Sequence, residues 1–407
     1  MKNNRTFLEK LLNGAEVEWK TLDEISSIYG GLTGKGKADF ENGNALYVPY
    51  KNIFNNIEVD FNNLEAVNVS DDERQYTIKY GDVLFTGSSE TAEEAGMSSA
   101  VTTKTEQKIY LNSFSFGLRF NDDVELLPEF SKFLFRTLSI RKEIVKSASG
   151  VTRFNISKAR FKKIKIPIPP LSVQTEIVRI LDALTALTSE LTSELTLRRK
   201  QYEYYREKLL SFDSLEQLNM GGAKKKLIDV AIYAKVRISA NKLNKENYVG
   251  VENLLQNKLG KTSSNYVPTE GSFIEYLPND ILIGNIRPYL RKIWLADKTG
   301  GTNGDVLVIR LTDKNILPRY LYHILANEHF FEYNIKYSKG AKMPRGDKAA
   351  ILQYEFDVPS LAEQHRIVSI LDKFETLTNS ITEGLPLAIE QSQKRYEYYR
   401  ELLLSFS

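Results

Sequence analysis

The longest regular pattern in the chain is a stripe of apolar residues spaced alternately four and three positions apart. The stripe runs from Ile177 to Phe212, and nine of its eleven positions are apolar or aromatic. A period of 3.5 residues held over this length is typical of a coiled-coil seam. Pro170 stops a helix from extending upstream, and Ser172 is the expected N-cap. We therefore predict one spacer helix over residues 172–212, roughly 60 Å long.

A second stripe with the same spacing begins at Ile367 and ends at Phe406. Gly384, Leu385 and Pro386 interrupt it, and glycine together with proline predicts a kink or break in the helix at that place. The second stripe contains four extra residues, which shift the seam locally. Because a globular segment separates the two helices along the chain, they can most simply pair with each other antiparallel.

Both helices belong to an internal repeat. PPLSVQTEIVRILD at residues 169–182 aligns with PSLAEQHRIVSILD at residues 359–372, with eight identities in 14 positions. Downstream, YEYYRE occurs at residues 202–207 and again at residues 396–401. Weaker matches, such as YVPYKNI with YVGVENL, extend the repeat upstream. The chain therefore consists of two copies of one unit.

The segments before the two helices alternate short strand-like runs with turns. Strand-like runs lie at residues 83–85, 281–283 and 306–311, and a proline precedes helical stretches at residues 128–147 and 318–333. The predicted fold class is α+β: two mixed α/β domains separated by two long antiparallel coiled-coil helices, with an internal pseudo-repeat. The predicted boundaries are 1–168 for the first domain with its N-terminal segment, 169–212 for the first spacer helix, 213–226 for a linker, 227–357 for the second domain and 358–407 for the second spacer region.

Composition narrows the possible chemistry. The 407 residues include no cysteine, which excludes disulfides, a thiolate nucleophile and a Cys-ligated metal. The three histidines, His323, His329 and His365, lack the spacing of a His-based zinc site. The N-terminal segment is polar and no run approaches the length of a membrane span. These features predict a soluble, cytoplasmic protein.

Basic residues are clustered although the net charge is only +3. No acidic residue lies between Arg153 and Lys165, and the loop-like segment 285–292 joins arginines to an asparagine. Arginine and asparagine pair with guanine and adenine edges, and lysine contacts phosphates. Solvated faces or a packed hairpin turn account for the same residues equally well. The candidate DNA-binding residues are Lys35, Lys37, Arg153, Lys158, Arg160, Lys162, Lys163, Asn285, Arg287, Tyr289, Arg291, Lys292, Lys342, Arg345 and Lys348.

No catalytic constellation stands out in the sequence. The segment GGLTGKG at residues 30–36 has one residue too few for a phosphate loop, and Gly36 takes the place of the Ser or Thr that binds magnesium. Neither a dinucleotide-binding glycine motif after a strand nor a nucleophile elbow is found. A chain of this length without such motifs favours recognition or scaffolding over catalysis.

The duplicated motifs resemble those of one family. Paired copies of P-x-L-x-x-Q-x-x-I-V-x-I-L-D and of Y-E-Y-Y-R-E-x-L-L-S-F are similar to the conserved regions of type I restriction–modification specificity subunits. The resemblance implies a non-catalytic subunit whose two target-recognition domains each read half of a bipartite sequence in double-stranded DNA. It also implies that the helices dock two methyltransferase subunits, through which motor-nuclease subunits join. S-adenosylmethionine, ATP and magnesium would belong to those partners, and no cofactor to this chain.

The conserved helical motifs supply candidates for the spacer and for subunit interfaces. Internal helix packing explains the tyrosines of the stripe at least as well as a partner surface does, although tyrosine beside arginine is also the composition of interface hot spots. The candidates are Gln174, Ile177, Leu181, Leu191, Leu195, Tyr202, Tyr205, Arg206, Gln364, Ile367, Leu371, Tyr396, Tyr399 and Arg400. Two other functions stay open from the residues alone: a coiled-coil scaffold that binds only proteins, and a self-sufficient DNA methyltransferase or nuclease.

A tandem tetrad occupies the middle of the first stripe. Residues 188–195 read TSELTSEL, which resembles the tetrad repeat of one branch of the family. In that branch the number of tetrads sets the gap between the half-sites, and the resemblance therefore implies that this helix is a ruler.

Overall fold

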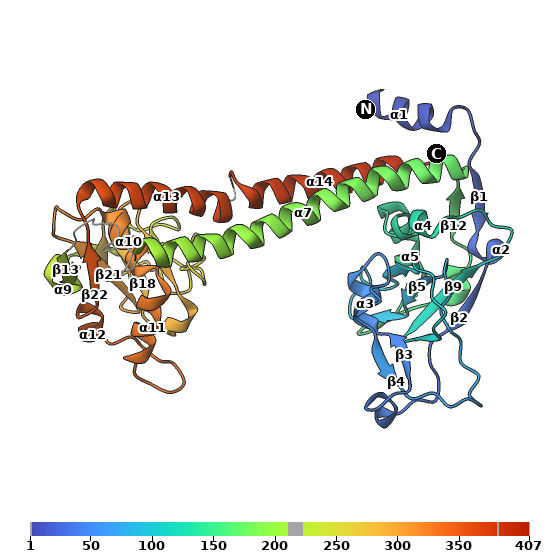
Figure 1. Cartoon of the computed structure of the whole chain (residues 1–407), viewed down its shortest axis with the longest axis horizontal. Helices are drawn as coiled ribbons and strands as arrows, with labels where there is room; N and C mark the ends of the chain where they lie inside the picture. Colours follow the sequence, from blue (N-terminus) through green and yellow to red (C-terminus); the bar gives the residue numbers. More distant parts are fainter. Residues whose placement is uncertain (1, 211–222, 381, 407) are drawn as a thin grey trace. The chain divides into compact units, whose positions relative to one another are not determined.

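A computed structural model describes residues 2–210, 223–380 and 382–406 of the chain (Figure 1). The chain forms two compact units, which we call unit 1 (Met1–Ser189 with Gln391–Ser407) and unit 2 (Glu190–Glu390). Each unit contains one mixed domain and a part of the spacer helices. The helix α7 (Leu171–Leu210) is uninterrupted over 40 residues and contributes to both units.

The core of unit 1 is built on a buried antiparallel sheet. Its central strand is β5 (Val83–Thr86), whose four residues are all buried, as expected for an apolar run that is covered on both faces. The strand order is β2-β9-β5-β7, and a second sheet has the order β4-β3-β8. The Phe85 ring lies 5.3 Å from that of Phe116 and 4.9 Å from that of Phe161. Aromatic packing therefore joins the sheet to the helices at its side.

The elements of unit 1 are short. They are α1 (Lys2–Leu12), β1 (Glu18–Thr21), α2 (Leu22–Ile25), β2 (Ser26–Gly30), η1 (Lys37–Phe40), β3 (Ala45–Val48), α3 (Tyr50–Asn55), β4 (Glu65–Val67), β6 (Ser88–Ser89), β7 (Ser98–Ala100), β8 (Ile109–Leu111), β9 (Ser115–Phe120), α4 (Pro128–Leu134), α5 (Leu138–Ser147), β10 (Ala148–Ser149), β11 (Phe154–Ile156), α6 (Lys158–Phe161) and β12 (Lys165–Ile168).

Unit 2 repeats this plan. Its main sheet has the order β14-β21-β18-β19, and a second sheet has the order β15-β17-β20-β16. Its elements are β13 (Ala223–Lys226), α9 (Leu227–Val230), β14 (Ala231–Tyr233), β15 (Arg237–Ser239), η2 (Ala240–Lys242), β16 (Tyr248–Val249), β17 (Ser272–Tyr276), β18 (Ile281–Gly284), η3 (Pro288–Leu290), β19 (Ile293–Leu295), β20 (Gly300–Thr302), β21 (Val306–Leu311), α10 (Pro318–Leu325), α11 (Glu328–Lys336), α12 (Lys348–Leu352), β22 (Glu355–Val358) and α13 (Leu361–Asn379).

The predicted strands and helices are confirmed with small changes. β21 has the predicted bounds, and each predicted helical stretch is two helices, α4 with α5 and α10 with α11. Each domain closes with an antiparallel strand pair just before its spacer helix, β1 with β12 and β13 with β22. Through this pairing β13 takes the last four residues of the predicted linker, 223–226, into unit 2. The rest of the predicted linker lies outside the described residues.

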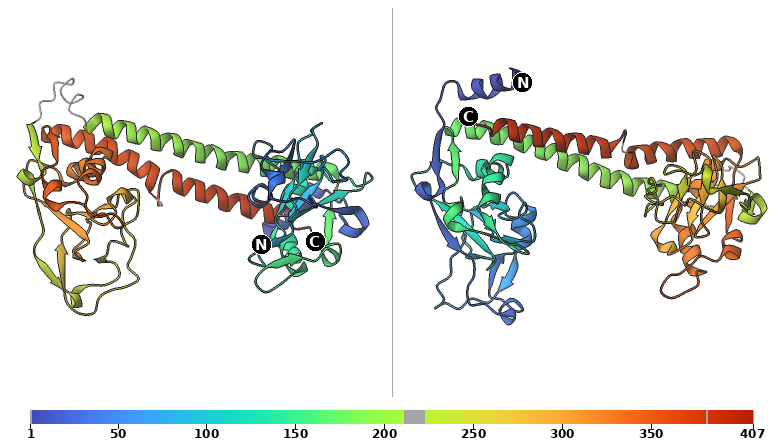
Figure 2. Two further views of the ribbon diagram at one scale, coloured as in Figure 1. Left: turned by 90° about the horizontal axis from the view of Figure 1, so that it is seen from below. Right: turned by 180° about the vertical axis from the view of Figure 1, so that it is seen from behind.

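The two spacer segments pack antiparallel within each unit. In unit 1 the Thr188 hydroxyl lies 2.8 Å from that of Ser392 on α14 (Leu385–Leu403), and in unit 2 the Tyr202 ring lies 6.0 Å from that of Phe374 on α13. Figure 2 shows α7 beside α14 in one unit and beside α13 in the other. The predicted break in the second spacer is confirmed, because α13 ends at Asn379 and Gly384 has a φ of +86° before α14 begins.

The predicted N-cap of α7 was wrong. The helix begins at Leu171, and the carbonyl of Pro170 accepts from the amides of Val173 and Gln174. Ser172 therefore lies inside the first turn. In the second copy a serine, Ser360, stands at the position of Pro170, and its hydroxyl accepts from the Glu363 amide at 3.3 Å. Among the helices that the structure describes, none is long and apolar enough to cross a membrane.

Candidate nucleic-acid interface and helix surface

Two basic segments that lie far apart in the sequence meet in unit 2. The Arg287 amide donates to the Pro344 carbonyl at 2.7 Å, and the Gly346 amide donates to the Asn285 carbonyl at 3.1 Å. The loop after β18 and the hairpin before α12 are thereby held side by side. Arg287, Lys342 and Arg345, which were separate sequence candidates, come together in this way, and all three are exposed. We call residues 285–291 with 339–346 the unit 2 loop pair.

The backbone of the unit 2 loop pair is unusual at its arginines. Arg287 and Arg291 have φ values of 53° and 50°, in the left-handed region that non-glycine residues rarely adopt. They flank the single turn η3, whose Pro288 is buried while Tyr289 is exposed. Strained non-glycine backbone of this kind is concentrated at functional sites. The arrangement presents the Arg287 side chain to solvent.

Three candidates of this region are buried or engaged by the protein itself. Asn285 is buried, and so its amide is not available to a base edge. Arg291 forms an ion pair with Glu328, and the Lys292 ammonium donates to the Val251 carbonyl at 2.7 Å. Burial lowers the pKa of Lys292. These residues shape the loop pair, whereas Lys348 at the start of α12 is exposed.

Unit 1 has a matching arrangement. β6 pairs with β11, and β11 pairs with β10, so the loop after β5 lies against the hairpin before α6. The Ile156 amide of β11 also donates to the Gly87 carbonyl at 2.9 Å, and glycine is required at position 87 because a Cβ there would lie 2.7 Å from the Phe114 carbonyl oxygen. We call residues 87–94 with 149–155 the unit 1 loop pair. The repeat therefore places the same two segments together in both domains.

The basic candidates of unit 1 differ in how far the protein itself engages them. Arg153 donates to the Ser88 hydroxyl at 3.2 Å, with its guanidinium 5.6 Å from the centre of the Phe114 ring. Lys162 forms an ion pair with Asp23 at 2.9 Å. Arg153 is nevertheless exposed, as are Lys158, Arg160 and Lys163, although the Arg160 guanidinium also donates to the carbonyls of Lys146 and Ala148 at 3.4 and 3.3 Å.

The two weaker candidates near the N-terminus differ from each other. The Lys35 side chain is nearly buried and lies 2.5 Å from Glu73, and their hydrogen bond lowers the pKa of Glu73 to about 2. The Lys35 side chain therefore stabilises the fold through this ion pair. Lys37 begins η1 and is exposed.

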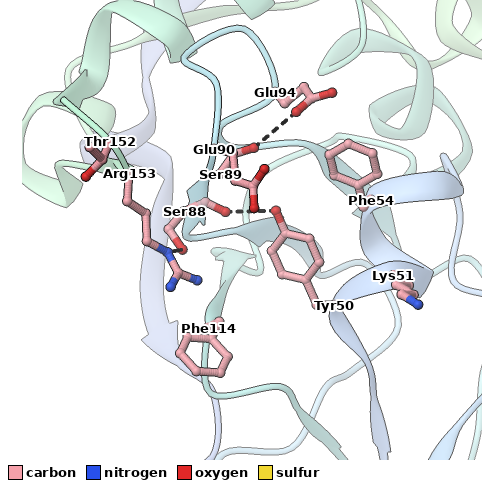
Figure 3. Close-up of a pocket in the computed structure, with 10 residues that line it drawn as sticks. All are labelled: Tyr50, Lys51, Phe54, Ser88, Ser89, Glu90, Glu94, Phe114, Thr152 and Arg153. Carbon is pink, nitrogen blue, oxygen red and sulfur yellow. Dashed lines mark hydrogen bonds between the residues drawn. The ribbon is translucent and has the colours of Figure 1, made fainter. Parts of the chain in front are cut away.

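A hollow of about 510 Å³ opens at the unit 1 loop pair (Figure 3). Figure 3 shows Tyr50 and Phe54 on one side and Arg153 with Phe114 on the other. The Tyr50 hydroxyl donates to the Ser88 carbonyl at 2.8 Å. The residues that line the hollow are Tyr50, Lys51, Phe54, Ser88, Ser89, Glu90, Glu94, Phe114, Thr152 and Arg153. Of these residues only Arg153 was a candidate from the sequence, because the hollow is assembled from segments that are distant along the chain.

Two equivalent glutamines fasten the domains to the helices. The Gln174 side chain accepts from the Leu127 amide at 2.8 Å and donates to the carbonyls of Glu125 and Pro169. The Gln364 side chain makes the same three bonds in unit 2, with Leu317, Asn315 and Pro359. Both glutamines are fully buried. Both glutamines were candidates for the spacer or for a subunit interface, and their buried surroundings fit a role in the spacer.

Most of the other helix candidates also lie inside a unit. Ile177 and Leu181 belong to the core of unit 1, Ile367 and Leu371 to that of unit 2, and Leu191 and Leu195 are half-buried. Tyr202 is buried against Phe374, and Arg206 lies 4.2 Å above the Tyr202 ring and is itself 3% exposed. Of the two roles left open for Arg206, its burial fits packing within unit 2 and not an exposed partner surface. Phe212 and Ile381, two further stripe positions, lie outside the described residues.

Exposed tyrosine pairs recur at matching positions on the two helices. On α7 the rings of Tyr204 and Tyr205 are 5.5 Å apart at 72°, and on α14 those of Tyr398 and Tyr399 are 5.4 Å apart at 77°. Their exposed fractions match as well, at 55% and 37% for the first pair and 51% and 38% for the second. We call these the tyrosine pairs. Tyr204 and Tyr398 were not candidates from the sequence because they lie off the apolar stripe.

The remaining candidates of α14 lie beside the second tyrosine pair. Tyr396 is half-buried against Phe133 of α4, with ring centres 6.3 Å apart. The Arg400 guanidinium lies 5.5 Å from the centre of the Tyr396 ring and pairs with Glu401 at 2.9 Å. This end of α14 is therefore attached to unit 1 by one face and exposed on the other.

One histidine lies among carboxylates between α10 and α13. His323 is buried, and its Nε2 lies 2.8 Å from Asp372, while burial lowers the pKa of the imidazole. Arg319 donates to both Asp372 and Glu375 at 2.7 Å. Because Arg319 bridges both carboxylates and His323 contacts one of them, the group acts as a structural link between the two helices. His365 is exposed on α13.

The chain matches proteins of one kind. Residues 15–198 and 221–391 match the family model described as type I restriction modification DNA specificity domain. The chain is 38% identical over 427 aligned positions to a type I restriction enzyme specificity subunit of Haemophilus influenzae, which covers 100% of both chains. It is 28% identical over 403 positions to the EcoprrI specificity subunit of Escherichia coli, covering 93% of this chain and 92% of that one.

Solved structures share the fold. The HsdS subunit from Thermoanaerobacter tengcongensis has a TM-score of 0.53 at 16% identity and covers 96% of both chains. A chain from a structure of a type I R-M system, solved to explain its assembly and conformational transition, has a TM-score of 0.61 at 16% identity and covers 96% of this chain and 98% of that one. With the family model matching twice along its length, the chain belongs to the DNA specificity subunits of type I restriction–modification systems.

Proposed function

We propose that the chain is the recognition subunit of a cytoplasmic type I restriction–modification complex, and that each unit reads one half of a bipartite DNA target. The observation that carries this proposal is the recurrence of the loop pair in both domains with different side chains. A scaffold repeated to recognise one ligand twice would keep the same side chains, whereas two readers of unlike half-sites would not. Type I specificity subunits supply recognition and not catalysis, and methyl transfer and cleavage belong to other subunits.

The basic residues divide into two roles in this proposal. Exposed lysines and arginines beside the loop pairs, such as Lys158 and Lys342, contact phosphates and fix the register on the duplex. Side chains presented by the loops themselves read base edges. Double-stranded DNA is therefore bound at one loop pair of each unit.

The tyrosine pairs dock two copies of one partner. A surface that occurs twice with the same ring geometry fits a protein that binds twice, and tyrosine is enriched at interface hot spots. We identify that partner as the methyltransferase subunit, which supplies the S-adenosylmethionine site. Motor-nuclease subunits, with ATP and magnesium, join through it.

The proposal is tested on the purified chain with and without its methyltransferase partner. We expect the complex to bind DNA with an affinity that falls steeply as salt rises, because phosphate contacts release counterions. We also expect the isolated chain to transfer no methyl group to DNA. Turnover by the isolated chain would favour a self-sufficient enzyme, and absent or salt-insensitive DNA binding in both preparations would favour a protein-binding scaffold.

Replacing Tyr204 and Tyr398 together by alanine should weaken binding of the methyltransferase partner at least tenfold, since hot-spot truncations cost about 2 kcal/mol or more. The melting temperature should stay unchanged, because both side chains are about half exposed. Binding is measured by calorimetry, with the exposed Tyr266→Ala as the matched control. Tyr202 does not suit this test, because its burial makes Tyr202→Ala a stability variant. Full binding by the double variant would exclude the tyrosine pairs from the interface.

Arg287→Ala should relax base preference in one half-site and leave the other half-site unchanged. The side chain is exposed on the unit 2 loop pair, and a bidentate base contact is worth about 1–3 kcal/mol. Methylation of randomised targets by the assembled complex measures the preference at every position. An equal loss on all sequences would instead assign Arg287 to a phosphate.

A further inference from the structure

The hollow of unit 1 differs chemically from the basic surface around it. It is lined by three aromatic rings, by the cations Lys51 and Arg153 and by the carboxylates Glu90 and Glu94. Glu94 accepts from the hydroxyls of Ser89 and Thr91 at 3.3 and 3.0 Å. Glu90 is exposed, and in the described part of the chain it has no ion pair or hydrogen bond. The hollow therefore presents one carboxylate that the fold does not use.

A carboxylate in a DNA interface has few favourable contacts. Phosphates repel it, and ionised carboxylates can only accept hydrogen bonds. In the major groove the base atoms that donate are the exocyclic amino groups, N4 of cytosine and N6 of adenine. Glu90 lies on the loop that follows β6, the strand that pairs with the hairpin carrying Arg153. A duplex bound by Arg153 and the neighbouring lysines would bring base edges toward this loop.

The equivalent positions of unit 2 carry different side chains. Counting from the aligned strands β5 and β18, Ser89 and Glu90 correspond to Arg287 and Pro288. Counting from β9 and β21, Phe114 corresponds to Asp305, which pairs with Arg345 at 3.2 Å. Unit 2 thus has the buried Pro288 at the position of Glu90, and its exposed Arg287 stands one position earlier, at the equivalent of the buried Ser89. The two loop pairs have one backbone plan and different side chains at their exposed positions.

We infer that Glu90 reads an exocyclic amino group, of cytosine or adenine, in the half-site bound by unit 1, with the hollow as its reading surface. This inference rests on the proposed function. The aromatic rings of Tyr50, Phe54 and Phe114 exclude water on either side of the contact. Arg153 donates to the Ser88 hydroxyl at the edge of the hollow, and from there it contacts the phosphate backbone of the DNA strand that carries this base. Glu90 is the specificity-determining residue, and Arg153 positions the DNA.

The test removes the exocyclic amino group from the DNA and the carboxylate of Glu90 from the protein, first separately and then together. Methylation mapping of the wild-type complex first gives the target. In duplexes of that sequence, each cytosine is replaced by 2-pyrimidinone and each adenine by unmodified purine, which lack the amino group. We expect one replacement in one half-site to weaken binding of the wild-type complex on the order of tenfold to a hundredfold. The same replacement should have little effect on the Glu90→Ala complex. The base whose replacement acts in this way distinguishes cytosine from adenine.

Glu93→Ala is the matched control, because Glu93 is an exposed carboxylate of the same loop that does not line the hollow. The Glu93→Ala complex should respond to the replacements as the wild type does. The inference would be overturned if the wild-type complex methylates a bipartite target and the Glu90→Ala complex keeps every base preference and every response to the replacements. The proposed function would then still stand. A wild-type complex without a bipartite target would overturn both.

Discussion

Deleting residues 192–195 is expected to shorten the gap between the two half-sites by one base pair and to keep both half-site sequences. The deletion removes one of two identical tetrads from α7, which is continuous and passes from unit 1 to unit 2 at residues 189–190. Four helical residues rise about 6 Å and turn about 400°, a net rotation of roughly 40°. One base pair of B-DNA adds about 3.4 Å and roughly 34–36°. The rotation lost by the helix therefore nearly matches the rotation lost by the shorter DNA.

The helix should tolerate this change. The deletion removes Leu195 and retains Leu191. Because four residues are close to the 3.5-residue period of the seam, Leu191 keeps its place on the inner face of the helix. Methylation mapping of the deletion variant measures the gap. Insertion of a third tetrad is the matched variant, and it should lengthen the gap by one base pair. An active deletion variant with an unchanged gap would mean that α7 is not the ruler.

Gln174→Leu and Gln364→Leu should each destabilise one unit by about 3 kcal/mol or more. Each substitution removes the glutamine partner of one backbone amide and two backbone carbonyls in surroundings that are partly or fully buried, and an unsatisfied buried group costs about 1–3 kcal/mol. Because the glutamines lie in different units, we expect the two variants to affect different parts of the unfolding transition.

Chemical denaturation followed by hydrogen exchange localises the effect of each glutamine. Gln174→Leu should lower protection of the unit 1 domain, and Gln364→Leu that of the unit 2 domain. Gln393→Leu, the same change at an exposed glutamine of α14, should leave the midpoint within about 0.5 kcal/mol of the wild type. Equal stability of all three variants would show that the buried bonds contribute nothing net.

The helices could be predicted from the sequence because their signals are local. The stripe from Ile177 and the Gly384 break are read within a few residues, and both are found in the structure. The cap of α7 could not be predicted by the same rule, since Ser172 is a good capping residue but the backbone turns at Pro170. The preference of single residues for capping positions therefore predicted the start of the helix only to within two residues.

The loop pairs could be predicted only in part, because they depend on contacts between distant segments. Arg287 and Arg345 were separate candidates until the bridge between Ile286 and Arg345 brought their loops together. Glu90 carries no signal in the sequence, since an acidic residue in a loop is usually solvated. Likewise Arg206 has the composition of a hot spot, and only the packing of α7 against unit 2 shows that it is buried.

The central claim is that one chain carries two independent readers, and methylation mapping of a cell that contains this chain and its methyltransferase partner tests it most directly. The account predicts a methylated motif made of two short specific sequences separated by a gap of fixed length, with the Arg287→Ala and Glu90→Ala complexes altered in opposite halves. A single uninterrupted motif, or two variants that alter the same half, would contradict it.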